Sequence, residues 1–145
     1  MWAGMIAHNN CCGVGRDQDW ASHDLEHGLS ALYDCAHGAG LAVVFPAWME
    51  YNMNHDVARF AQIAVRVWGC SMDFQNPENT AKAGIKAFRN FLRSIGMPQT
   101  LGEVGGKAED IPPLVKNFGL AEGTKTGGFV NLSSEDIAEI YKLAL

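Results

Sequence analysis

The sequence predicts an all-α fold. Three observations support this prediction: apolar residues recur at helical spacing in several segments, capping and helix-stop residues separate those segments, and no run alternates apolar with polar residues as a half-buried strand does. The chain has 145 residues, of which 48% are hydrophobic and 19% charged, a composition typical of a globular protein. At roughly 100–200 residues per domain, residues 1–145 are expected to form a single helical domain.

The first expected helix covers residues 20–33. Asp19 precedes it as a candidate N-cap, and Gly38 with Gly40 breaks the pattern after it. A second helix is expected to start near these glycines and to continue to Met49.

The next two helices have clearer signals at their ends. Apolar residues at i, i+3, i+4 and i+7 predict an amphipathic helix over residues 57–68, which Gly69 ends. The dipeptide Asn76-Pro77 predicts a helix start, with asparagine as the N-cap and proline as the first helical residue. Gly96 is expected to end that helix.

Residues 99–130 are rich in glycine and proline and are the least regular part of the chain. One short helix is expected within them, over residues 111–118. Ser133, followed three residues later by Asp136, resembles a capping box and predicts a last helix that runs to Leu145.

Charge and composition exclude several functional classes. There are 11 Lys and Arg against 16 Asp and Glu, giving a net charge of −5, so nucleic acid is not an expected partner. The four cysteines form no C-x-x-C pair, which argues against a zinc ribbon or a thioredoxin-type motif. The N-terminus does not resemble a signal peptide, and no apolar stretch approaches the roughly 20 residues of a membrane span. The sequence therefore predicts a cytoplasmic protein with no membrane partner.

Three of the five histidines, His23, His27 and His37, fall within fifteen residues. Helical spacing places His23 and His27 on one face. In one straight helix His37 would lie about 21 Å from His23, too far to share an ion. If the helix ends near Asp34 and the chain turns at Gly38-Ala39-Gly40, His37 faces the first helix from the start of the next. Because imidazole is the commonest metal ligand, the three histidines form a candidate metal site.

Two functional hypotheses can be drawn from the residues without reference to any family. The segment His23-Asp24-Leu25-Glu26-His27 fits the H-x-x-E-H pattern of inverted zincins, which favours a small zinc metallohydrolase with Glu26 as general base. The other alternative is a non-catalytic helical module that binds a partner through apolar surface.

The residues around the histidines resemble a known family. From Trp20 to Pro46 the chain reads WASHDLEHGLSALYDCAHGAGLAVVFP, which is similar to the histidine signature of iron-dependent alcohol dehydrogenases, in particular the butanol dehydrogenase branch. The likeness extends through Trp48-Met49, Arg66-Val67-Trp68-Gly69 and the stretch from Phe88 to Pro98, and covers nearly the whole chain. It implies the helical C-terminal metal-binding domain of an NAD(P)H-dependent enzyme that interconverts primary alcohols, such as butanol, and their aldehydes.

The resemblance also implies roles for the three histidines. In the family, the two histidines spaced like His23 and His37 are metal ligands, and the histidine matching His27 lies close to the nicotinamide and the substrate. His27 is therefore the implied catalytic residue, as a proton relay. The implied cofactors are Fe(II), with Zn(II) as the alternative, and NAD(P)H. Cys35 stands where an aliphatic residue is usual, which concerns packing rather than metal binding.

Family members are longer and include an N-terminal half that binds the nucleotide and supplies two further metal ligands. Gly13-Val14-Gly15 does not continue into a complete G-x-G-x-x-G motif, so no cofactor-binding residue is assigned. We therefore expect the chain alone to be inactive. Its implied partners are a small alcohol or aldehyde, and either a complementing nucleotide-binding half or a second copy of the chain.

Overall fold

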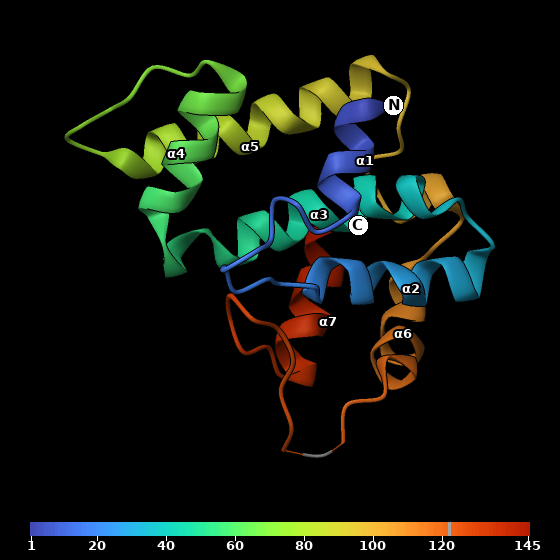
Figure 1. The fold of residues 1–145 in the computed structure, drawn as a ribbon. Helices are drawn as coiled ribbons and strands as arrows, with labels where there is room; N and C mark the ends of the chain where they lie inside the picture. The colour runs from blue at the N-terminus through green and yellow to red at the C-terminus, as the bar shows by residue number, and fades with distance from the viewer. Residues whose placement is uncertain (122) are drawn as a thin grey trace.

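The structure, a computed structural model, describes residues 1–121 and 123–145 (Figure 1). It confirms the all-α prediction: these residues contain no strand, and one isolated antiparallel bridge joins Thr126 to Leu132. Residue 122, in the predicted irregular stretch, lies outside the described residues. None of the described helices is both long and apolar enough to span a membrane. The α-helices are α1 (Trp2–His8), α2 (Ala21–Tyr33), α3 (His37–Asn52), α4 (Val57–Trp68), α5 (Pro77–Ser94), α6 (Ile111–Phe118) and α7 (Ser134–Leu143), with 3₁₀ turns at Met53–His55, Gly102–Val104 and Ala108–Asp110.

The chain reverses direction between α2 and α3, as the histidine spacing requires. Asp34 ends α2 in the left-handed conformation (φ 51°), and its amide donates to the Ser30 carbonyl at 3.0 Å. Ala36 is extended, and α3 begins at His37. The prediction of a turn at residues 38–40 is wrong, because Asp34 and Ala36 already reverse the chain and both glycines lie inside α3.

The buried core is built around α3. Figure 1 shows this helix across the middle of the molecule, with α4 and α5 on one side and α2, α6 and α7 on the other. Three helices, α2, α5 and α7, pack directly against it. Pro46 lies inside α3, buried, where it leaves one backbone hydrogen bond unmade. The core includes Leu25 and Leu29 from α2, Val43, Val44 and Ala47 from α3, and Ile137, Ile140 and Tyr141 from α7.

Helices α4 and α5 pack closely against each other. At Gly84 of α5, a Cβ atom would lie 2.8 Å from the Ala64 Cα of α4, so only glycine allows this approach. The bounds of α4 are the predicted ones. Its N-cap, Asp56, accepts a hydrogen bond from the Arg59 amide at 3.0 Å, and Gly69 ends the helix with a φ of 66°.

The predicted starts of the last three helices are confirmed. Helix α5 begins at Pro77, and α6 occupies residues 111–118. The predicted capping box opens α7: Ser133 Oγ accepts a hydrogen bond from the Asp136 amide at 3.3 Å, and the Asp136 carboxylate accepts one from the Ser133 amide at 2.7 Å. Helix α7 ends at Leu143, two residues before the predicted end.

The N-terminal helix α1 is absent from the sequence-based prediction. It buries none of its residues, and Trp2 is 72% exposed. With seven residues and no capping side chain at Met1, this helix lacks the length and the start signal on which a prediction from sequence depends.

The segment that leads into α2 is held by Asp19. The N-cap of α2 is Trp20, one residue after the predicted position, although Asp19 Oδ1 still accepts a hydrogen bond from the Ala21 amide at 2.7 Å. The other oxygen of Asp19 accepts hydrogen bonds from the amides of Gly128 and Phe129 at 3.1 and 2.7 Å. One carboxylate thus joins the start of α2 to a loop more than a hundred residues away.

The three tyrosines are protected from ionisation by the fold. Burial, together with a hydrogen bond donated to Asp110, raises the pKa of Tyr33 to about 12. A hydrogen bond donated to Asp136, together with burial, raises the pKa of Tyr51 to about 12. Burial also raises the pKa of Tyr141 above the ordinary range.

We expect these phenols to stay protonated in the native protein near pH 10, where an exposed tyrosine ionises. Because their folded-state pKa values are raised, their contribution to stability is fully present below about pH 10 and is lost as the pH rises through about 12. A titration that follows tyrosinate absorbance and helical circular dichroism together tests this. Tyrosinate should appear late and with the loss of helix, and a phenol that ionises near pH 10 in the folded chain contradicts the prediction.

Candidate metal centre

Three histidines meet where α2 and α3 come together. His23 and His27 lie one turn apart on α2, and His37 is the first residue of α3. The ring centroid of His23 is 4.5 Å from those of both His27 and His37, and the latter two are 5.7 Å apart. The structure therefore brings together all three histidines selected from the sequence; they are referred to below as the histidine cluster.

A buried carboxylate adjoins the histidine cluster. Glu26, on α2, is fully buried, and its Oε2 accepts a hydrogen bond from Nδ1 of His37. Its Oε1 accepts a hydrogen bond from the Ser30 hydroxyl. One potential ligand atom from each of Glu26, His27 and His37 lies within 4.8 Å of the others. Sequence analysis considered Glu26 only as a general base and missed its contact with His37, for which the spacing of residues within one helix carries no signal.

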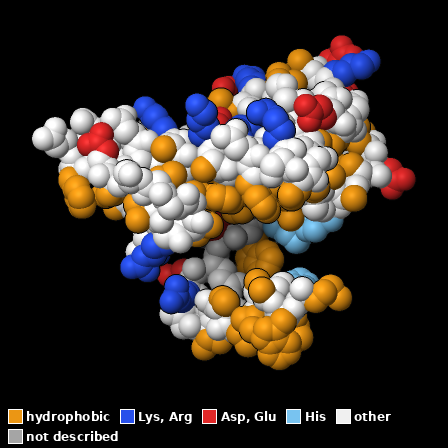
Figure 2. Space-filling view, turned by 90° about the horizontal axis from the view of Figure 1, so that it is seen from above, with side chains coloured by type: hydrophobic (Ala, Val, Ile, Leu, Met, Phe, Trp, Pro, Cys, Tyr) orange, Lys and Arg blue, Asp and Glu red, His pale blue; other side chains and the backbone are white. Residues whose placement is uncertain are grey.

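The histidine cluster lies at the surface. The His37 side chain is 45% exposed, and His27 is exposed as well. Figure 2 shows histidine side chains at the molecular surface next to hydrophobic ones. Burial, and then the neighbouring His27 and His37, lower the pKa of His23. A lowered pKa favours neutral imidazole, the form that can bind a metal.

The chemistry of these donors fits a divalent transition metal. Because Nδ1 of His37 is bound to Glu26, its Nε2 is the nitrogen left for a metal. His23 and His27 bring further imidazole nitrogens close by. Imidazole suits iron, zinc and copper, but two or three such ligands do not complete a tetrahedral or octahedral site. Further ligands would have to come from elsewhere.

The zinc metallohydrolase alternative does not agree with this geometry. A general base must reach a water molecule beside the metal. Glu26 is fully buried, and its two oxygens already accept hydrogen bonds from Ser30 and His37. The H-x-x-E-H pattern is present in the sequence without the exposed carboxylate that its chemistry needs.

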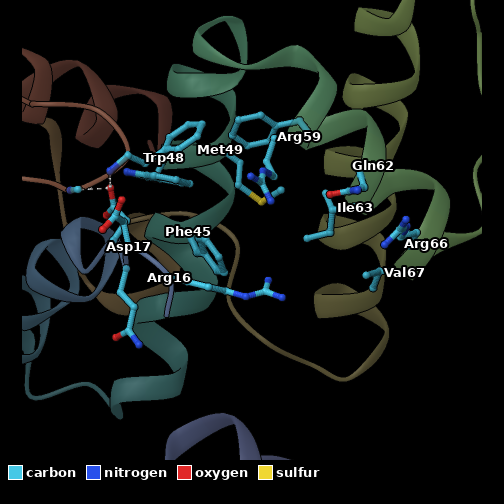
Figure 3. Close-up of a pocket in the computed structure, with 15 residues that line it drawn as sticks. Arg16, Asp17, Phe45, Trp48, Met49, Arg59, Gln62, Ile63, Arg66 and Val67 are labelled. Carbon is cyan, nitrogen blue, oxygen red and sulfur yellow. Dashed lines mark hydrogen bonds between the residues drawn. The ribbon is translucent and has the colours of Figure 1, made fainter. Parts of the chain in front are cut away.

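A separate groove of about 900 Å³ lies between α3, α4 and the segment before α2 (Figure 3). Phe45 and Trp48 of α3 and Ile63 of α4 line it with apolar surface, and Arg16 reaches into the space between α3 and α4. None of the three histidines lines this groove. The histidine cluster is therefore the candidate site for metal chemistry.

Comparison with known proteins shows the family to which the chain belongs. A family model described as "Fe-containing alcohol dehydrogenase family, C-terminal" matches residues 1–145. The chain belongs to this family. Among its Fe-containing alcohol dehydrogenase relatives, it is 37% identical over 143 residues to NADH-dependent butanol dehydrogenase A of Clostridium acetobutylicum, covering 98% of the chain and 36% of the relative. It is 33% identical over 144 residues to the NADPH-dependent aldehyde reductase YqhD of Escherichia coli, covering 99% of the chain and 37% of the relative.

A solved structure of the Fe-containing alcohol dehydrogenase family has the same fold. The crystal structure of NADH-dependent butanol dehydrogenase A from Thermotoga maritima matches with a TM-score of 0.90 at 42% identity, over 99% of this chain and 37% of that one. The chain thus spans little more than a third of the length of these relatives. The family resemblance and the fold expected from the sequence are both confirmed.

Proposed function

We propose that this chain is the helical metal-binding domain of an NAD(P)H-dependent alcohol dehydrogenase that interconverts primary alcohols, such as butanol, and their aldehydes. The observation that carries the proposal is the meeting of His23, His27 and His37 beside a buried carboxylate. Membership of the Fe-containing alcohol dehydrogenase family supports it, as do relatives named butanol dehydrogenase and aldehyde reductase. In a non-catalytic interaction module this cluster would have no role.

In this proposal His23 and His37 bind the metal, Fe(II) or alternatively Zn(II). When bound, the metal supplies Lewis-acid chemistry, which stabilises negative charge on the oxygen of the alcohol or aldehyde. His27 is the proposed catalytic residue. Its exposed imidazole, beside the two ligands, can pass a proton between the substrate oxygen and solvent.

NAD(P)H is proposed to bind to a nucleotide-binding half that also completes the metal site. The share of the relatives that this chain spans, 36–37%, supports this division. The chain alone is therefore expected to be inactive. A second copy of the chain is the other candidate protein partner.

Metal titration of the purified chain tests the proposal. Calorimetry under anaerobic conditions measures the binding of Fe(II) and Zn(II). We expect weak, saturable, one-to-one binding, because the chain holds part of the ligand set. His37→Ala should weaken binding strongly, whereas His8→Ala, which replaces an exposed histidine of α1, should not. Affinity should also fall as the pH is lowered, since protonated imidazole cannot bind a metal, and the lowered pKa of His23 keeps that ring neutral to a lower pH than an ordinary histidine. Tight binding by the isolated chain would contradict the division of the site between two halves, and equal binding by His37→Ala and the wild type would contradict the role of His37.

A further inference from the structure

We infer that Glu26 is a positioning residue for His37: it fixes the tautomer and orientation of that ring so that Nε2 is presented for metal binding. The inference rests on the proposed function, in which His37 is a metal ligand. It gives Glu26 a role different from both the general base of a hydrolase and a direct metal ligand.

The hydrogen bonds of Glu26 define this role. An ionised carboxylate only accepts hydrogen bonds, so the Nδ1 of His37 that contacts Oε2 must carry the proton. In a neutral ring the lone pair is then on Nε2, the atom that a metal requires. Oε1 accepts the Ser30 hydroxyl, so each oxygen of this buried carboxylate has a hydrogen-bond partner within the protein and the carboxylate is held in place against His37.

The carboxylate is also confined sterically. Gly40, in the first turns of α3, lies against it: a Cβ atom there would overlap Oε1 and lie 3.0 Å from Cδ of Glu26. A side chain at residue 40 would therefore displace the carboxylate from His37. This close approach explains why a glycine that does not turn the chain lies inside α3.

Burial of the charge is offset by its surroundings. An unpaired buried carboxylate is costly, but Glu26 has two hydrogen-bond donors and lies beside the N-terminal part of the 16-residue helix α3, where the helix dipole favours negative charge.

The same contacts would also arise if the only role of Glu26 were to join α3 to α2. The experiment must therefore measure a property of the His37 ring, and not only stability.

The tautomer of His37 can be read directly in the metal-free chain. In nitrogen-15 NMR spectra at pH 8, His37 should carry its proton on Nδ1 in the wild-type chain. Glu26→Leu should shift the population toward the Nε2–H form, and Glu26→Gln should give a mixture, because an amide can both accept and donate. Asp24→Asn, a matched loss of one negative charge on the same helix, should leave the tautomer unchanged. An unchanged tautomer in folded Glu26→Leu, or an Nε2–H tautomer in the wild-type chain, overturns the inference.

Zinc affinity gives a second readout. Glu26→Gln is expected to weaken Zn(II) binding by roughly 10- to 100-fold, the usual effect of removing a carboxylate that orients a metal-binding histidine. Asp24→Asn should stay within about twofold of the wild type. Unchanged affinity in Glu26→Gln overturns the inference, as does a loss as complete as that of His37→Ala, which would make Glu26 a ligand. If His37→Ala binds zinc as well as the wild type does, the proposed function fails, whereas the tautomer measurement still tests the role of Glu26. Circular dichroism of each variant checks that it is folded.

Discussion

Replacing His23 with alanine is expected to abolish metal-dependent turnover when this chain works together with a nucleotide-binding half. The substitution removes one proposed metal ligand from the middle of the cluster, where the His23 ring lies 4.5 Å from both His27 and His37. Lewis-acid stabilisation by a metal contributes several kcal/mol, so its loss should lower kcat/KM by roughly 1000-fold or more.

The effect of His23→Ala on turnover can be measured in a chimeric enzyme. The chain would replace the matching part of butanol dehydrogenase A from Thermotoga maritima, to which it is 42% identical, and NADH oxidation with butanal would be assayed beside metal content. His8→Ala is the control and should retain activity. His27→Ala should lose roughly 100-fold or more in kcat while keeping its metal, because it is a proposed proton relay and not a ligand. Full activity and normal metal content in His23→Ala would refute the assignment.

Replacing Tyr141 with alanine is expected to lower the free energy of unfolding by about 3–5 kcal/mol. Tyr141 is fully buried in α7, and its hydroxyl donates a hydrogen bond to the Leu25 carbonyl of α2 at 2.8 Å. Its ring therefore fills the core next to the helix that carries two of the three histidines. Since a domain has about 5–15 kcal/mol of stability in total, this change consumes a large share of it.

Urea unfolding followed by circular dichroism measures the effect. Tyr141→Phe is the matched control: it keeps the ring and loses only the hydroxyl, so it should cost about 1 kcal/mol. A loss below about 1 kcal/mol in Tyr141→Ala would mean that the contact between α7 and α2 does not stabilise the fold as described.

Helices that bury one face and have clear end signals could be predicted from the sequence. Helix α4 has the predicted bounds because its apolar stripe ends at Gly69. The reversal before His37 could be predicted but not placed, because Asp34, and not a glycine, adopts the left-handed conformation. Helix α1 could not be predicted, since it has only seven residues and no capping side chain.

The candidate site could likewise be predicted only in part. Spacing within one helix, and the need for a chain reversal, were enough to group His23, His27 and His37. The contact between Glu26 and His37 depends on how α3 lies across α2, and on Gly40 leaving room for a carboxylate. Such a contact follows from tertiary packing, which the pattern of a single helix does not encode.

The histidine cluster draws its members from two helices that are joined by a short turn. An ion bound across His23 and His37 would therefore also tie α2 to α3. A ligand that binds only the folded chain adds to its stability by mass action, about 2.7 kcal/mol at a hundredfold excess over Kd. An ion at this place would then hold the chain in its folded form as well as take part in the proposed chemistry.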